Sequence, residues 1–157
     1  MATEIERKFL VQPGWPQPAR GTRLVQGYLS RGGLVSVRVR KSERQAWLTV
    51  KGPTDGISRA EFEYEVPPTD ADEMLALAVT ALIEKTRYLV PHGPHVVEVD
   101  VFAGANAGLV VAEVEFRSAD ESFLPPPWCG VEVTSDPRYR NSALAERPFT
   151  TWERDTQ

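Results

Sequence analysis

The sequence contains a single cysteine, Cys129, and only two histidines among its 157 residues. A lone cysteine cannot form an internal disulfide. With no histidine near it in sequence, Cys129 is better interpreted as a small buried thiol than as a nucleophile. The chain also lacks an apolar run of about 18 residues and a basic-then-apolar leader, so nothing in it predicts a membrane span or an export signal. We therefore expect a cytoplasmic protein without a membrane partner.

Neither sign of charge is in large excess. Lys and Arg number 18 and Asp and Glu 22, and the net charge of −4 gives no reason to expect nucleic acid as a partner. The apolar fraction of 41% and the charged fraction of 25% are ordinary for a folded protein and argue against disorder. Because no internal repeat or low-complexity segment divides the chain, we expect residues 1–157 to form one domain.

The first 11 residues carry a charge pattern that organises the rest of the sequence. Glu4, Glu6 and Lys8 alternate with Ile5 and Arg7. Successive side chains of a strand point to opposite faces, so the two glutamates and the lysine share one face. Two carboxylates on one face repel each other unless a cation lies between them, and hard divalent cations bind such oxygens. The alternative is a strand face that is simply solvated.

The same alternate spacing of charges recurs along the chain, and each strand tends to carry one sign. The further positions are Arg38 and Arg40, Lys51, Glu61 and Glu63, Lys85 and Arg87, Glu98 and Asp100, and Glu113 and Glu115. Like charges on one strand are destabilising unless neighbouring strands compensate them.

Two architectures fit this pattern. In an antiparallel sandwich the charged faces would point to solvent. In an inverted barrel they would point to a wet lumen, with the apolar faces outside under helices. In the barrel, a basic wall would bind phosphate oxygens and an acidic wall would bind divalent metal. The residue pattern does not decide between the two.

Periodicity and turn residues also predict the local elements. After the N-terminal strand we expect strands at residues 23–31, 34–40, 45–51, 59–66, 81–90, 95–102 and 109–117, and a further extended piece at 130–134. Gly32 and Gly33 indicate a hairpin turn. Thr69 or Asp70 is expected to cap a helix, another short helix is expected from residue 118, and a last one at 139–146.

Taken in order, the charged positions resemble the CYTH superfamily, the triphosphate tunnel metalloenzymes. The motifs that carry the resemblance are Glu4-Ile-Glu6-Arg-Lys8, Arg38-Val-Arg40, Thr49-Val-Lys51, Glu61-Phe-Glu63, Glu84-Lys85-Thr-Arg87-Tyr88, Glu98-Val-Asp100-Val-Phe102, Glu113-Val-Glu115-Phe, Glu132-Val-Thr134 and Tyr139-Arg-Asn141. They span residues 3–145. The first motif alone is weak, whereas the ordered set is specific. The compact length is most similar to that of the small bacterial members.

The resemblance implies an α+β fold in which an eight-stranded, antiparallel, closed β-barrel has a charged lumen and a few flanking helices. It implies metal-dependent hydrolysis of a triphosphate in that tunnel, with magnesium, or manganese in its place, as the cofactor. The short loops offer little surface for a nucleoside or thiamine, which favours inorganic tripolyphosphate as the small-molecule partner, with pyrophosphate and phosphate as products.

The resemblance also implies a role for each charged position. The implied metal ligands are Glu4, Glu6, Glu61, Glu63, Asp100, Glu113 and Glu115. The implied substrate-binding residues are Lys8, Arg38, Arg40, Lys51, Lys85 and Arg87. The catalytic set is Glu4, Glu6, Lys8 beside the scissile phosphate, and Tyr28 pointing into the same region.

Other functions stay open on the sequence. Within the superfamily they are a tunnel-type adenylate cyclase and a thiamine triphosphatase. Outside it, a non-catalytic module that binds polyphosphate or nucleotides would keep the basic residues and relax the carboxylates. The outward apolar faces also suggest a homodimer.

Overall fold

The computed structural model describes residues 3–30 and 33–152, so Arg31 and Gly32 of the expected second strand and turn lie outside the described part. The strands are β1 Thr3–Val11, β2 Thr22–Tyr28, β3 Ser36–Lys41, β4 Ala46–Lys51, β5 Ser58–Val66, β6 Ile83–His92, β7 His95–Ala103, β8 Val110–Glu115 and β9 Cys129–Glu132. The helices are α1 Pro68–Ala76 and α2 Asn141–Glu146, with short 3-10 turns η1 Gly104–Asn106, η2 Pro137–Tyr139 and η3 Phe149–Thr151. None of the helices in the described part is long and apolar enough to cross a membrane.

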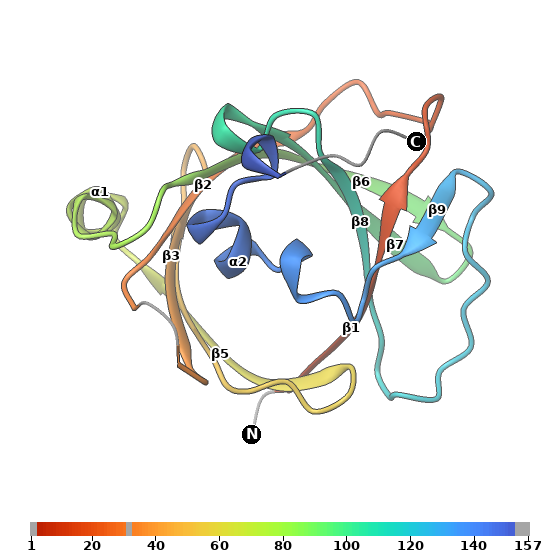
Figure 1. Ribbon diagram of the computed structural model, residues 1–157, viewed down its shortest axis with the longest axis horizontal. Helices are drawn as coiled ribbons and strands as arrows, with labels where there is room; N and C mark the ends of the chain where they lie inside the picture. The colour runs from red at the N-terminus through yellow and green to blue at the C-terminus, as the bar shows by residue number, and fades with distance from the viewer. Residues whose placement is uncertain (1–2, 31–32, 153–157) are drawn as a thin grey trace.

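The strands close into an antiparallel barrel (Figure 1). The order around the ring is β5-β4-β3-β2-β6-β7-β8-β1, and residues 3–5 of β1 pair with β5 to close it. The later part of β1 pairs with the short strand β9 instead, at Phe9 and Val11. The expected eight-stranded barrel is therefore confirmed, and β9 extends it at one edge.

The strand register determines which side chains face the lumen. Directly opposed residues of an antiparallel pair share a face. Lys8 lies opposite Glu113, and Arg87 lies opposite Asp100. The alternate charged residues point inward as a consequence, and the sandwich with solvated charged faces is excluded.

The apolar residues between the charged ones pack on the outside of the barrel. Val97 and Val99 are fully buried, and the segment that precedes β9 covers them with side chains such as Phe123. Helix α1 covers another part of the wall, where its Ala71 packs against Val39 of β3. Burying each such aliphatic side chain stabilises the fold by roughly 1.5–3 kcal/mol.

One end of the lumen is apolar. Ile83, Phe102 and Val111 take lumen-facing positions there because they lie opposite Gln26, Lys85 and Asp100 respectively. Leu144 of α2 packs against this cluster. Figure 1 shows α2 inside the outline of the ring of strands. The C-terminal segment therefore fills one end of the barrel and leaves the charged part of the lumen as a cavity.

Two expectations about helices are wrong. Helix α1 begins at Pro68, and no side chain caps it. Proline fits the first helical turn because the N–H that it lacks has no partner inside the helix there. The expected helix from residue 118 is a turn followed by irregular chain, whose aromatic side chains pack on the barrel.

Candidate active site

A cavity of about 360 Å³ lies in the charged part of the lumen. The basic residues that line it include Lys8, Arg38, Arg40, Lys51, Lys85 and Arg87. The acidic residues are Glu4, Glu6, Glu61, Glu63, Glu98, Glu113 and Glu115. Tyr28 also reaches the cavity. All the residues proposed from sequence as site residues line it except Asp100.

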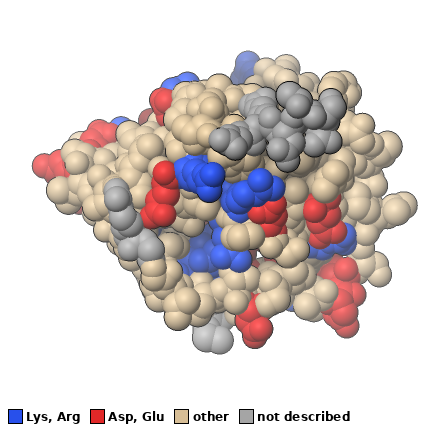
Figure 2. Space-filling model, in the orientation of Figure 1, with Lys and Arg blue, Asp and Glu red and all other residues tan. Residues whose placement is uncertain are grey.

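The two signs of charge lie on different arcs of the barrel. The neighbouring strands β4, β3, β2 and β6 supply all the lining lysines and arginines named above except Lys8. We call this the basic arc. The acidic arc consists of β7, β8, β1 and β5, which supply all seven lining glutamates. Figure 2 shows basic and acidic side chains gathered around the hollow on the face viewed in Figure 1.

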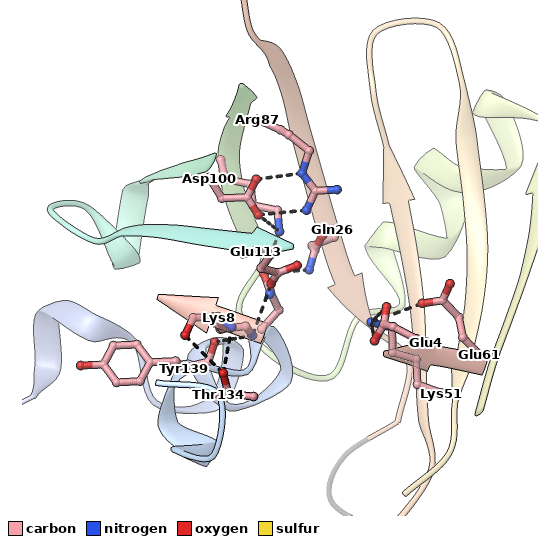
Figure 3. Close-up of polar contacts among 12 residues, drawn as sticks. Glu4, Lys8, Gln26, Lys51, Glu61, Arg87, Asp100, Glu113, Thr134 and Tyr139 are labelled. Carbon is pink, nitrogen blue, oxygen red and sulfur yellow. Dashed lines mark hydrogen bonds and ion pairs between the residues drawn. The ribbon is translucent and has the colours of Figure 1, made fainter. Parts of the chain in front are cut away.

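Asp100 lies on the lumen face of β7, opposite Arg87, but does not itself line the cavity. It holds two bases of the basic arc. Its Oδ2 lies 2.9 Å from Lys85 Nζ, and its Oδ1 accepts a 2.8 Å hydrogen bond from Arg87 Nε (Figure 3). Burial would raise the pKa of Asp100, but the two cations outweigh it and lower that pKa. Burial lowers the pKa of Lys85 to about 8 although Asp100 opposes the shift. The aspartate is thus charged and fully engaged with cations.

Lys8 lies on the acidic arc, and so does Arg59 of β5. The Lys8 ammonium lies 3.3 Å from Glu113 Oε1 and donates a 3.3 Å hydrogen bond to the carbonyl oxygen of Tyr139. Its backbone N–H donates to Thr134 Oγ1 at 2.9 Å. Burial would lower the pKa of Lys8, but Glu113 and Glu6 raise it, so the ammonium stays protonated.

The glutamates of β1 form a chain of carboxyl contacts with their neighbours. Glu4 interacts with Glu61 and with Lys51, whose Nζ lies 3.0 Å from Glu4 Oε1 (Figure 3), and Glu6 interacts with Glu113. Burial, Glu113 and Glu4 raise the pKa of Glu6 to about 10. Burial and Glu4 raise that of Glu61 to about 7. Burial would raise the pKa of Glu4, but the hydrogen bond from Glu61 and the charge of Lys51 lower it to about 2.

This donor set fits a hard divalent cation. Within residues 3–30 and 33–152 no three carboxylates converge in advance on one point as a metal site. They are instead close pairs that hold protons between them, as the raised pKa values of Glu6 and Glu61 show. A divalent cation bound by carboxylate oxygens relieves the same repulsion that the protons relieve.

The arginines of β3 have unused donors. Arg38 and Arg40 approach Glu63 Oε2 at 3.7 Å and 3.6 Å, and the buried Nε groups of both arginines have no hydrogen-bond partner among the described residues. Burial, with the like charge of Arg38, lowers the pKa of Arg40 to about 10. An unpaired buried donor costs about 1–3 kcal/mol, so an anion in the cavity would be bound favourably here.

Sequence reasoning assigned no role to two polar residues near the site, although Asn141 stands in one of the motifs that carry the resemblance. The Oδ1 atom of Asn141 accepts hydrogen bonds from Lys85 Nζ at 3.0 Å and from Gln26 Nε2 at 3.2 Å. Gln26 is uncharged but lies two positions before Tyr28, so alternation along β2 was the available signal. Asn141 belongs to the C-terminal segment, where no strand period places it.

A closed antiparallel barrel with a basic arc facing an acidic arc across an internal cavity is a distinctive class of protein. Residues 2–143 match the CYTH domain. The chain therefore belongs to the CYTH family.

Similar proteins cover nearly the whole chain. An inorganic triphosphatase of Acetivibrio thermocellus is 44% identical over 151 residues, which are 95% of this chain and 97% of the relative. An inorganic triphosphatase of Nitrosomonas europaea is 40% identical over 148 residues, 91% of this chain and 97% of the relative. A crystal structure of an inorganic triphosphatase matches with a TM-score of 0.67 at 38% identity, over 92% of this chain and 95% of that one.

Proposed function

We propose that the protein hydrolyses inorganic tripolyphosphate to pyrophosphate and orthophosphate in a metal-dependent reaction. The observation that carries this proposal is the cavity of about 360 Å³ between the basic and acidic arcs. A short polyanion with bound divalent cations complements both arcs at once. The names of the relatives from A. thermocellus and N. europaea support the same activity.

The basic arc would hold the phosphate chain. Arg38 and Arg40 offer buried Nε donors that have no partner in the described part of the chain, and a guanidinium binds phosphate oxygens with two parallel hydrogen bonds. Lys51, Lys85 and Arg87 add charge along the same wall. We assign Asp100 to positioning, because both its oxygens already contact cations.

The acidic arc would hold magnesium, or manganese in its place. The carboxylates that line the cavity and fit this role are Glu4, Glu6, Glu61, Glu63, Glu113 and Glu115. When bound, the metal neutralises charge on the phosphate oxygens and so assists phosphoryl transfer.

The chemical step is a displacement at the terminal phosphorus. A water oxygen forms the new P–O bond, the bond from that phosphorus to the bridging oxygen breaks, and pyrophosphate leaves. The water proton passes to a carboxylate of the acidic arc. Lys8 would stabilise charge on the reacting phosphate, and the Tyr28 hydroxyl would donate to a phosphate oxygen, since both side chains reach the cavity.

Phosphate release from tripolyphosphate, ATP and thiamine triphosphate, each with magnesium, manganese or chelator, tests the proposal. We expect rapid metal-dependent release from tripolyphosphate, which Glu4→Gln abolishes. Glu73→Gln is the matched control, because Glu73 is exposed on α1 far from the cavity lining. Preference for an organic triphosphate, or binding without turnover, would contradict the proposal.

A further inference from the structure

A second cavity, of about 380 Å³, adjoins the first beside α2. The two cavities share six lining residues, which we call the neck: Tyr28, Ser36, Thr54, Arg59, Arg140 and Ser142. The neck contains two guanidinium groups, four hydroxyl groups and no carboxylate. The neck therefore differs in composition from the glutamate-lined part of the first cavity, where divalent cations would be bound.

The two arginines of the neck are not neutralised by local ion pairs. Arg59 Nε donates a 3.1 Å hydrogen bond to the carbonyl oxygen of Gly52. Within the described part of the chain, neither guanidinium lies within the 4.0 Å ion-pair distance of a carboxylate oxygen. Burial lowers the pKa of Arg59, Glu4 opposes this effect, and the charge of Arg140 adds to it. The like charges of Arg59 and Arg140 are therefore close enough to act on each other.

Guanidinium and hydroxyl donors together bind phosphoryl oxygens without a metal. We propose that the neck is a second, metal-independent phosphoryl subsite, which takes the outer phosphoryl group of a linear phosphate longer than tripolyphosphate. The other phosphoryl groups would lie in the first cavity, so this inference rests on the proposed function. The observation that favours an extended chain is the continuity of the two cavities through the neck.

Calorimetry measures the binding of tetrapolyphosphate and of tripolyphosphate to wild type and to Arg140→Gln in the presence of calcium. Titrations of orthophosphate into the same proteins are made without metal. Arg140 is suited to the test because it lines both cavities and takes part in none of the ion pairs found among the described residues. Arg44→Gln is the matched control, since Arg44 is an exposed arginine on a turn and the change in charge is the same. Circular dichroism verifies that each variant is folded.

We expect Arg140→Gln to weaken tetrapolyphosphate binding about tenfold more than tripolyphosphate binding, because a charge-assisted hydrogen bond to the fourth phosphoryl group is lost. If Arg140→Gln loses orthophosphate binding in chelator but keeps the wild-type preference for tetrapolyphosphate, the subsite is supported and free phosphate is identified as its ligand. Two results would overturn the subsite. One is that Arg140→Gln weakens the binding of both chain lengths equally. The other is that even the double variant Arg59→Gln/Arg140→Gln binds tetrapolyphosphate as tightly as Arg44→Gln does. Failure of wild type to hydrolyse tripolyphosphate would instead overturn only the proposed function, since these are binding measurements.

Discussion

Lys85 and Asp100 form a buried ion pair in the barrel wall, with 2.9 Å between Nζ and Oδ2. Both side chains are almost completely buried, and Arg87 binds the same carboxylate through its Nε and Nη2 atoms at 2.8 Å and 3.0 Å. One carboxylate thus supports two bases that point toward the cavity. A buried charge that loses its partner is costly, which makes Asp100 decisive for both stability and the site.

Asp100→Asn should therefore destabilise the protein by about 3–5 kcal/mol, because the buried charge of Lys85 loses its carboxylate partner and Arg87 keeps only its contact with Glu98 among the described residues. Urea denaturation measures the change in the free energy of unfolding. The control is Glu84→Gln, which breaks the largely exposed ion pair between Glu84 and Arg23 and should cost about 0–1 kcal/mol. Equal effects of the two substitutions would contradict the role of Asp100.

The pKa shifts of the glutamates predict how stability varies with pH in chelator. The folded protein keeps a proton on Glu6 up to about pH 10, whereas the unfolded chain releases it near the ordinary value of 4.5. Glu61, with a pKa of about 7, acts in the same direction. The folded state therefore binds more protons than the unfolded state above pH 4.5, and the free energy of unfolding falls as pH rises. Glu4, whose pKa is lowered to about 2, has the opposite effect only below pH 4.5.

Thermal unfolding in chelator should consequently show a falling Tm as the pH is raised from about 5 to 8, and Glu6→Gln should flatten that slope. Magnesium should restore Tm most strongly at the upper end, since a cation replaces the proton between the carboxylates. At a magnesium concentration of 100 times Kd the gain is about 2.7 kcal/mol. A slope that is the same in wild type and Glu6→Gln would show that other groups control it.

Arg40 presents a buried Nε donor to the cavity, and a lysine cannot reproduce its fork of donors. Arg40→Lys keeps the charge, and we expect it to raise KM for tripolyphosphate about tenfold through loss of one charge-assisted hydrogen bond. Steady-state kinetics, beside Arg44→Lys at an exposed turn, measures this effect. An unchanged KM would mean that charge alone, and not the geometry of the guanidinium, binds the substrate at this position.

Alternation along the strands was enough to predict which charged side chains share a face, because the side-chain period of a strand is two. It did not decide whether that face points to the lumen or to solvent, which the resemblance to the family implied. The same rule applied to β5 places Arg59 on the same face as Glu61. That Arg59 lies near Arg140 depends on the path of the C-terminal segment, which the rule does not predict. Asn141 and Arg140 follow a 3-10 turn and have no period that reveals their direction. Asp100 does not line the cavity because Lys85 and Arg87 both contact its carboxylate, and the spacing of charges along the sequence does not predict these contacts.

The two residues that follow β9 fix the backbone of Lys8. Val133 N donates to the carbonyl oxygen of Lys8 at 2.8 Å, and the N–H of Lys8 donates to Thr134 Oγ1 at 2.9 Å. The Thr134 hydroxyl in turn donates to Glu132 Oε2 at 2.6 Å, so it is oriented to accept from Lys8. Hydrogen bonds to both the N–H and the carbonyl oxygen of Lys8 hold its backbone in place and so position its ammonium in the cavity.

Thr134→Val keeps the shape of the side chain and removes the hydroxyl. We expect the free energy of unfolding to fall by about 1 kcal/mol and kcat for tripolyphosphate to fall about tenfold with KM little changed, since Lys8 is displaced from the reacting phosphate while the basic arc is intact. Thr134→Ser restores the hydroxyl and should return kcat to within about twofold of wild type. A purely packing role predicts the opposite order, in which Thr134→Ser, which lacks the methyl group, lowers Tm and kcat more than Thr134→Val, which keeps the shape of threonine. Rescue by serine therefore separates the positioning of Lys8 from packing.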